Sequence, residues 1–215
     1  MSSSRPTGQA LEIETPHGLA RAHLHPADDP RGAVVLGHGA GGGVGAPDLL
    51  AAADASLAAQ FTVALVEQPY RVAGRRSPAP AHQLDAAWLA VVGQLRAVLP
   101  AGLPLAMGGR SSGARVACRT AAAAGAIGVV CLAFPLEPPR RSGATASSSR
   151  LGELDAVAVP TLVVQGVNDR FGMPPPGKLR TVVQVRGDHS LRSDRPAVVD
   201  AVRDWLAKLP VPSAR

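Results

Sequence analysis

The sequence predicts a single-domain α/β protein with a mostly parallel sheet, helices on both faces and an antiparallel hairpin near its N-terminus. From residue 33 onward, short apolar runs alternate with helical patterns, which is typical of parallel strands joined by helices. Several of these runs are apolar throughout, as expected for strands that are covered on both faces. The chain has 215 residues, of which 46% are hydrophobic, and this suffices for one sizeable core.

The N-terminal region predicts two strands that precede the first fully apolar run. Ala10–Thr15 and Leu19–His25 alternate in polarity and are separated by a Pro-His-Gly turn. His23 and His25 lie two positions apart and would share one face of the second strand, as a metal-binding pair would. Because no third ligand is evident, we expect half-exposed histidines and no metal.

The later elements follow from periodicity and from turn residues. Apolar side chains at helical spacing, from Leu84 to Leu95, indicate a helix over Ala81–Leu99. The other expected helices are Pro47–Ala59, 113–125, Leu151–Val157 and Arg195–Lys208. The other expected strands are Ala33–Leu36, Phe61–Glu67, a run that ends at Met107, Gly128–Ala133, Val159–Gln165 and Thr181–Val185.

Irregular stretches define the domain organisation. Gln68–Pro80 and Phe134–Arg150 have no periodicity, and the second is too short to hold a helical cap, so we expect no cap domain. We expect one domain over residues 10–208, with a flexible tail over 1–9 and a C-terminal tail over 209–215.

Composition and charge argue against several kinds of partner. The formal net charge is +6, but the arginines are scattered and aromatic residues make up only 3%, so we expect no nucleic-acid partner. The longest apolar stretch, Ala121–Phe134, is broken by glycines and is shorter than the roughly 20 residues that span a bilayer. Cys118 and Cys131 suit buried thiols better than a disulfide. With a polar N-terminus unlike a signal peptide, these features predict a cytoplasmic protein without a membrane partner.

The most informative stretch lies between the run that ends at Met107 and the helix after it. Gly109-Arg110-Ser111-Ser112-Gly113 fits the nucleophile-elbow pattern G-x-S-x-G in a strand–turn–helix setting. A serine on so sharp a turn has a strained backbone, so the residues two before and two after it must lack side chains. The pattern predicts Ser111 as a nucleophile, and a helix-capping serine in a glycine-rich turn is the simpler alternative.

Two further polar residues complete a chain order of serine, aspartate and histidine. Asp169 and His189 each follow directly after an expected strand. Because ligands gather at the carboxyl ends of parallel strands, we expect both side chains to meet Ser111. A histidine can take the serine proton, and a carboxylate behind the ring can fix its tautomer. Asp188 is the rival acid, but its place beside His189 makes Nδ1 difficult for it to reach.

The loop after Ala33–Leu36 is rich in glycine and supports two interpretations. In the first, the backbone N–H groups of Ala40 and Ser112 form an oxyanion hole. In the second, Gly37-x-Gly39-x-x-Gly42 is a dinucleotide fingerprint, with Glu67 as the ribose-binding acid. The second interpretation places the loop after the third strand instead of the first and leaves the serine, aspartate and histidine without a role.

Five segments together resemble the α/β-hydrolase superfamily, in its dienelactone-hydrolase-like part. Within it, the chain is most similar to a small lidless branch related to the NSL histone-acetyltransferase-complex subunit and the testis-expressed hydrolase-like proteins. The segments are LGHGAGGG (36–43), EQPYRVAGRRSPAP (67–80), GGRSSGAR (108–115), QGVNDRFG (165–172) and GDHSL (187–191). The resemblance extends from residue 10 to residue 208. It implies an α/β-hydrolase fold with Ser111, Asp169 and His189 as the catalytic triad.

The expected function is therefore that of a serine hydrolase, which cleaves an ester or related acyl bond of a small soluble substrate through an acyl-serine intermediate. No metal or cofactor is expected. Dienelactone hydrolases carry a cysteine as nucleophile, so their substrate does not carry over to a chain with Ser111. Some relatives in this branch lack a triad member, which leaves a catalytically silent binding or scaffold module as the alternative.

Several loop residues are expected near the substrate. They are His38, Tyr70, Arg71, Arg110 and Arg170. These arginines, with Arg75 and Arg76, either pair with an anionic substrate through their guanidinium groups or hold the loops together.

Overall fold

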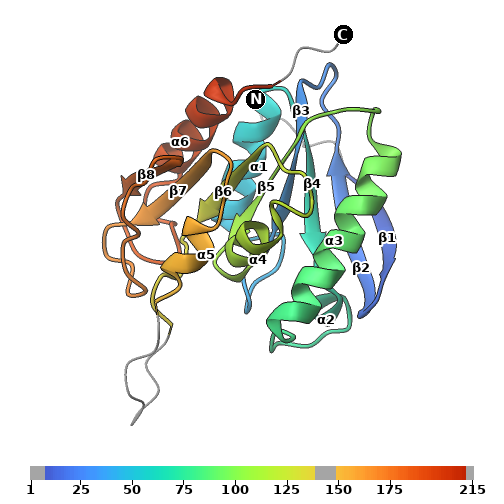
Figure 1. Cartoon of the computed structure of the whole chain (residues 1–215), viewed down its shortest axis with the longest axis horizontal. Helices are drawn as coiled ribbons and strands as arrows, with labels where there is room; N and C mark the ends of the chain where they lie inside the picture. Colours follow the sequence, from blue (N-terminus) through green and yellow to red (C-terminus); the bar gives the residue numbers. More distant parts are fainter. Residues whose placement is uncertain (1–7, 139–148, 212–215) are drawn as a thin grey trace.

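A computed structural model describes residues 8–138 and 149–211 of the chain. Its strands form one eight-stranded sheet in the order β1-β2-β4-β3-β5-β6-β7-β8 (Figure 1). Only β2 runs against the other described strands, because it pairs antiparallel with both β1 and β4. The strands are β1 (Gln9–Thr15), β2 (Gly18–His25), β3 (Gly32–Gly37), β4 (Phe61–Glu67), β5 (Leu105–Arg110), β6 (Gly128–Leu132), β7 (Thr161–Gly166) and β8 (Arg180–Val185).

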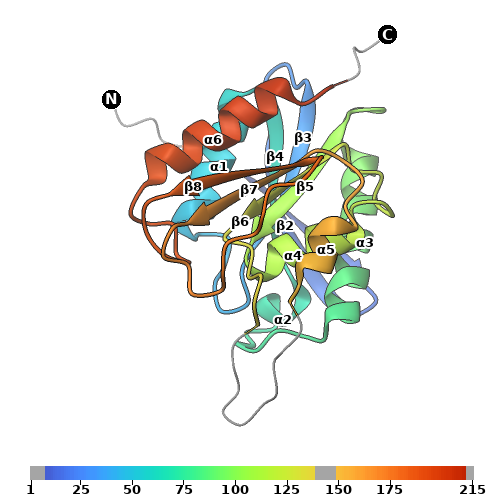
Figure 2. The ribbon, with the colours of Figure 1, turned by 60° about the vertical axis from the view of Figure 1, so that its left-hand side comes forward.

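Helices cover both faces of the sheet. Figures 1 and 2 show α1 and α6 on one face, and α3, α4 and α5 on the other. The described helices are α1 (Pro47–Ala58), α2 (Pro69–Val72), α3 (Ala81–Val98), α4 (Ser112–Thr120), α5 (Leu151–Asp155) and α6 (Arg195–Lys208). The fold is the single-domain, mostly parallel α/β architecture that the alternation of elements predicts.

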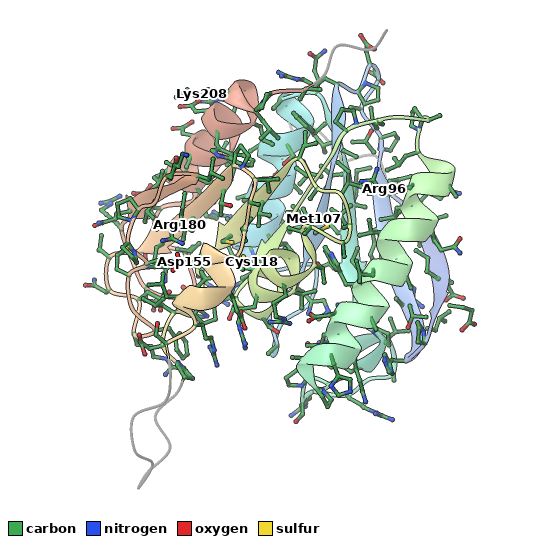
Figure 3. All side chains as sticks on the ribbon, in the orientation of Figure 1. Arg96, Met107, Cys118, Asp155, Arg180 and Lys208 are labelled. Carbon is green, nitrogen blue, oxygen red and sulfur yellow. The ribbon has the colours of Figure 1, made fainter. Side chains whose placement is uncertain are left out.

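The two helix layers bury two separate apolar cores, because successive side chains of a strand point to opposite faces of the sheet. Val35 and Met107 pack on the face of α3 and α4, where Cys118 also lies in the interior (Figure 3). Their neighbours Val34 and Ala106 pack on the face of α1 and α6. Strands β3 to β7 are therefore apolar on both faces, as the continuous apolar runs indicate.

Several elements differ from the sequence expectations for local reasons. The helix expected over 113–125 ends at Thr120, because Gly125 takes a left-handed φ of 60° and the Ala126 N–H donates to the Ala121 carbonyl at 3.0 Å. The short helix α2 was not expected, and it begins at a proline, which suits the first turn of a helix. Strand β7 begins at Thr161 instead of Val159, directly after Pro160.

The domain also extends beyond both expected limits. Gln9, placed in the N-terminal tail, pairs with Leu24 as the first residue of β1. Leu209, placed in the C-terminal tail, is only 3% exposed and packs with the core that α6 covers. The rest of both tails (residues 1–7 and 212–215) and part of the expected loop (139–148) lie outside the described residues. In the described ranges, no helix is both long and apolar enough to cross a bilayer.

The backbones of β3, β5 and α4 approach so closely that glycine is required where they meet. A Cβ atom added to Gly109 or to Gly113 would collide with the carbonyl oxygen of Gly37. A Cβ on Gly108 would likewise collide with the Val130 carbonyl oxygen of the neighbouring strand β6. These are backbone contacts, so a rotated side chain cannot relieve them, and the close approach fixes the turn that holds Ser111.

We predict that Gly113→Ala lowers the free energy of unfolding by about 1–3 kcal/mol or more, because the new methyl group overlaps rigid backbone. Urea unfolding followed by circular dichroism measures the change. Gly93→Ala is the matched control, since Gly93 is also helical and a Cβ there meets no described atom within 4 Å. The control is expected to raise stability by up to about 1 kcal/mol through helix propensity. Equal stabilities of the two variants would contradict the steric argument.

Candidate active site

Ser111 occupies the turn between β5 and α4 with φ 52° and ψ −106°, a conformation that a serine rarely adopts. Its N–H donates to the Leu132 carbonyl at 2.9 Å, and its own carbonyl accepts from the Arg115 N–H at 3.2 Å. The strain is thus held in place by the neighbouring strand on one side and by the first turn of α4 on the other. The Ser111 side chain does not cap the helix, so the simpler alternative for this serine is wrong.

The three side chains expected to meet form one chain of hydrogen bonds. His189 Nε2 lies 3.0 Å from Ser111 Oγ, and His189 Nδ1 lies 2.8 Å from Asp169 Oδ2. The Asp169 side chain is fully buried and the His189 side chain is 19% exposed. The chain therefore runs from a buried carboxylate, through the ring, to a hydroxyl beside solvent. It joins the ends of β5, β7 and β8, which lie far apart in the sequence.

The Asp169 carboxylate is fixed by two donors besides the ring. Oδ1 accepts the Phe171 N–H at 2.9 Å, and Oδ2 accepts Gln165 Nε2 at 2.8 Å. Gln165 is fully buried near the end of β7, and its two Nε2 hydrogens are shared among Asp169 Oδ2 and the carbonyls of Phe134 and Gly172. Sequence reasoning missed Gln165, although a polar residue that closes a fully apolar strand was the available signal.

The rival acid, Asp188, does not contact the ring. Its Oδ1 accepts from the N–H of Ser190 at 2.8 Å and from the Ser190 hydroxyl at 2.6 Å. These two hydrogen bonds lower the pKa of Asp188 below its usual value. The carboxylate closes a local turn at the surface, as its place next to His189 predicts.

Arg110 connects the loop of His189 to helix α1. Its Nε donates to Asp48 Oδ2 at 2.7 Å, and its Nη2 donates to the His189 carbonyl at 3.1 Å. The Asp48 side chain is 1% exposed, and burial raises its pKa while the Arg110 charge opposes that shift. Arg110 was expected near the substrate, but two of its donors hold other parts of the chain. Asp48 was not singled out by sequence reasoning.

Hydrogen bonds from His38 and Tyr70 hold the glycine-rich loop after β3 in place. His38 Nδ1 donates to the Gly39 carbonyl at 2.8 Å, and Nε2 accepts the Gln68 N–H at 3.1 Å. The Tyr70 hydroxyl donates to the Ala40 carbonyl at 2.9 Å. Burial lowers the pKa of His38 and raises the pKa of Tyr70 to about 12, so both groups are neutral at pH 7. Both residues were expected near the substrate, but His38 has no ring nitrogen left for a ligand.

The two expected oxyanion donors lie on either side of the elbow. Ser112 is the first residue of α4, so its N–H has no acceptor within the helix. Ala40 lies in the loop that packs against the elbow, since a Cβ on Gly39 would meet Arg110 and Ser111. Their role as an oxyanion hole remains a prediction.

The remaining arginines are exposed or partly exposed. The Arg170 guanidinium lies 4.8 Å from the centre of the Phe171 ring, and that ring meets the His189 ring edge-on at 4.5 Å. Arg71 Nη1 lies 3.4 Å from the Arg75 carbonyl, and Arg75 and Arg76 are exposed. An anion-binding role for these residues stays a prediction.

The alternative sites of the sequence analysis find no support in these contacts. Glu67, the supposed ribose-binding acid, lies 3.0 Å from His23 Nε2 and 3.8 Å from Arg21 Nη1. Within residues 8–138 and 149–211, no three His, Cys, Asp or Glu side chains are grouped so that they would hold a metal ion. Cys118 and Cys131 are buried thiols with sulfur atoms 3.5 Å apart.

Comparison with known proteins identifies the family. The model of the alpha/beta hydrolase domain family matches residues 30–201, so the chain belongs to that family. No curated protein matches the sequence significantly.

Solved structures share the fold at low sequence identity. A lidless α/β serine hydrolase from Xanthomonas campestris, XC6422, is 21% identical with a TM-score of 0.69, and the match covers 97% of both chains. Est1E from Butyrivibrio proteoclasticus is 16% identical with a TM-score of 0.74, over 94% of this chain and 99% of that one. A dienelactone hydrolase from Anabaena variabilis is 17% identical with a TM-score of 0.69, over 96% and 97%.

We predict that Arg110→Met lowers the free energy of unfolding at pH 7 by about 3 kcal/mol, because it leaves the Asp48 carboxylate buried without its partner. The double variant Asp48→Leu/Arg110→Met should recover most of that loss. The loss should also shrink as the pH falls, because protonation of Asp48 removes the unpaired charge. Urea unfolding at several pH values measures both effects.

Arg203→Met is the matched control, since Arg203 forms its ion pairs on an exposed face of α6. This variant should leave the free energy of unfolding unchanged within error. A loss in Arg110→Met no larger than that of the control would show that the Asp48 contact does not anchor the loop.

Proposed function

We propose that this protein is a serine hydrolase that cleaves an ester or related acyl bond of a small substrate through an acyl-serine intermediate. The observation that carries this proposal is the hydrogen-bonded chain from Asp169 through His189 to Ser111. Membership of the α/β hydrolase family supports it, because that fold positions such a chain at the carboxyl ends of its strands.

The acylation step uses His189 as the base. Ser111 Oγ attacks the carbonyl carbon of the substrate while its proton moves to His189 Nε2, 3.0 Å away. Nδ1 keeps its proton and donates a hydrogen bond to Asp169, whose negative charge stabilises the imidazolium. When the tetrahedral intermediate collapses, the leaving alcohol takes the proton from Nε2 and the acyl group remains on Ser111.

Deacylation reverses these roles with water as the nucleophile. His189 takes a proton from the water, the hydroxide attacks the acyl carbon, and the released Ser111 Oγ recovers the proton. In both steps the negative oxygen of the intermediate faces the N–H groups of Ala40 and Ser112. The buried bonds of His38 and Tyr70 to the carbonyls of Gly39 and Ala40 keep that loop in place.

The substrate is proposed to be small or extended, because the described residues between β6 and α5 form no helix or strand that would cover the site. XC6422, which shares the fold, is described as lacking a lid. The relation to the NSL-complex subunit and the testis-expressed proteins is part of this proposal and rests on the segment at residues 67–80. A cytoplasmic location is also part of this proposal, and the two reduced, buried thiols favour it.

We predict that a fluorophosphonate probe labels Ser111 and that Ser111→Ala abolishes the labelling. Hydrolysis of short acyl esters should fall by about 10⁴-fold in Ser111→Ala and in Asp169→Asn, since the second change removes the charge that orients the ring. Mass spectrometry locates the label, and a screen over short esters, thioesters and lactones gives kcat/KM.

Ser190→Ala is the matched control, because Ser190 is beside His189 in sequence but its hydroxyl bonds to Asp188 alone among the described residues. This variant should keep labelling and hydrolysis within about twofold of the parent protein. A folded protein that neither labels nor hydrolyses any of these substrates would point instead to the catalytically silent binding module.

A further inference from the structure

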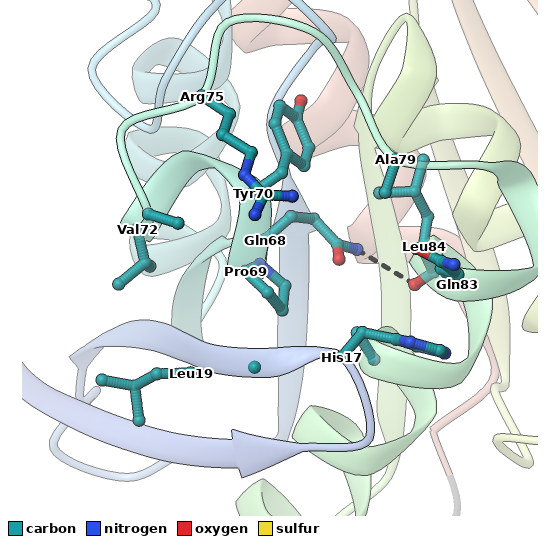
Figure 4. A pocket seen from close by; sticks show the side chains of 13 residues that line it. His17, Leu19, Gln68, Pro69, Tyr70, Val72, Arg75, Ala79, Gln83 and Leu84 are labelled. Atoms are coloured by element: carbon teal, nitrogen blue, oxygen red, sulfur yellow. Dashed lines mark hydrogen bonds between the residues drawn. The ribbon is translucent and has the colours of Figure 1, made fainter.

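A pocket lies beside the loop that carries Ala40, apart from Ser111, Asp169 and His189. It is enclosed by the turn between β1 and β2, by α2 and the loop after it, and by the start of α3 (Figure 4). Its volume is about 290 Å³, close to the lower end of small-molecule sites. Ser111, Asp169 and His189 do not line it.

The walls combine an apolar surface with two polar groups, Gln68 and Arg75, that have unused capacity for hydrogen bonds. Pro69, Val72 and Leu84 supply part of the apolar lining. Gln68 is only 6% exposed, and its Nε2 donates to the Leu84 carbonyl at 3.2 Å, while its Oε1 has no partner among the described residues. A buried amide oxygen without a donor costs stability, so a ligand that supplies an N–H or O–H is favoured there.

Arg75 gives the pocket a positive charge. Its side chain is exposed, and Figure 4 shows its guanidinium turned inward toward Tyr70 and Gln68. No described carboxylate bonds to this guanidinium. A guanidinium beside an apolar surface pairs well with a carboxylate, because it offers two parallel N–H donors.

We propose that this pocket binds a small organic carboxylate that also carries a hydroxyl or N–H donor. The carboxylate pairs with Arg75, the apolar body covers Pro69 and Leu84, and the donor bonds to Gln68 Oε1. Rotation about the terminal torsion of Gln68 turns its oxygen toward the ligand, and the same rotation moves Nε2 relative to the Leu84 carbonyl.

The residues that line this pocket also support the loop that carries Ala40. Occupancy of the pocket therefore changes the rate of the proposed hydrolysis. Gln68 holds His38 through its backbone N–H, and Tyr70 holds the Ala40 carbonyl. A ligand that packs against Gln68 and Tyr70 therefore stabilises the position of the Ala40 N–H. This coupling rests on the proposed function, whereas binding to the pocket does not.

Hydroxybenzoates are suitable probes, because the 3- and 4-isomers place a hydroxyl at two fixed separations from a carboxylate. In ¹H–¹⁵N NMR titrations, one of them should shift the amide signals of residues 68–75 and bind more tightly than benzoate and 4-hydroxybenzamide. Arg75→Ala should weaken binding about fivefold to tenfold, and Gln68→Met should remove the advantage of the hydroxyl.

Arg76→Ala is the matched control, since Arg76 is exposed on the same loop but does not line the pocket. It should leave the affinity within about twofold. Shifts confined to the triad loops, or equal affinities of the Arg75 and Arg76 variants, would overturn the proposal. Thermal melting of Gln68→Met shows whether that variant is folded. If it is unfolded, the difference in affinity between Arg75→Ala and Arg76→Ala still tests the proposal.

Protein labelled at Ser111 with fluorophosphonate separates this inference from the proposed function. The probe should bind labelled and unlabelled protein with the same affinity, because the pocket is distinct from the triad, and loss of binding on labelling would overturn that distinction. Saturating probe should change kcat/KM of ester hydrolysis at least twofold, and an unchanged value would overturn the coupling. If no labelling or hydrolysis occurs, the titration of the unlabelled protein still tests the pocket.

Discussion

The close approach of three backbone segments is the constraint on which the rest of this structure depends. The end of β3, the end of β5 and the start of α4 meet at Gly37, Gly109 and Gly113, where no side chain fits. This contact forces the chain to turn sharply at Ser111 and holds that residue at a positive φ. The strain is balanced by the buried sheet around it, and it directs the serine side chain toward the loops at the edge of the sheet.

Buried polar contacts then bring the other loops to the elbow. Gln165 and the Phe171 N–H fix the carboxylate of Asp169, while Arg110 ties the His189 loop to Asp48. The Arg110 contacts join segments that are distant in sequence, whereas Gln165 and Phe171 lie within four residues of Asp169. These hydrogen bonds offset the hydration that the buried carboxylates of Asp48 and Asp169 lose. The arrangement of Ser111, Asp169 and His189 is therefore part of a wider hydrogen-bond network and does not depend on the elbow alone.

The loop after β3 shows how one segment serves two parts of the molecule. His38 and Tyr70 are neutral and bonded to backbone atoms, so they support the loop from inside the fold. Gln68 and Tyr70 also line the neighbouring pocket. The segment between β4 and α3 is thus the physical connection between that pocket and the Ala40 loop.

The sequence by itself determined the layers of the fold and which three side chains meet at the ends of β5, β7 and β8. Continuous apolar runs required strands covered on both faces, and the chain order of Ser111, Asp169 and His189 at strand ends required that they converge. The G-x-S-x-G pattern around Ser111 occupies five consecutive residues and can therefore be recognised in the sequence, although the Gly37 carbonyl that excludes side chains there comes from β3. The end of α4 and the limits of the tails were less certain, because alanine and leucine fit either a helix, a turn or a packed terminus.

Only the tertiary structure decided which partners the polar side chains bond to. Arg110, His38 and Tyr70 were expected at the substrate, yet their donors and acceptors bond to Asp48 and to the carbonyls of His189, Gly39 and Ala40. A residue's type gives its hydrogen-bonding capacity but not the partner, because a partner such as Asp48, which is 62 residues from Arg110, comes from another element. Long-range packing makes that choice, and no local pattern in the chain records it.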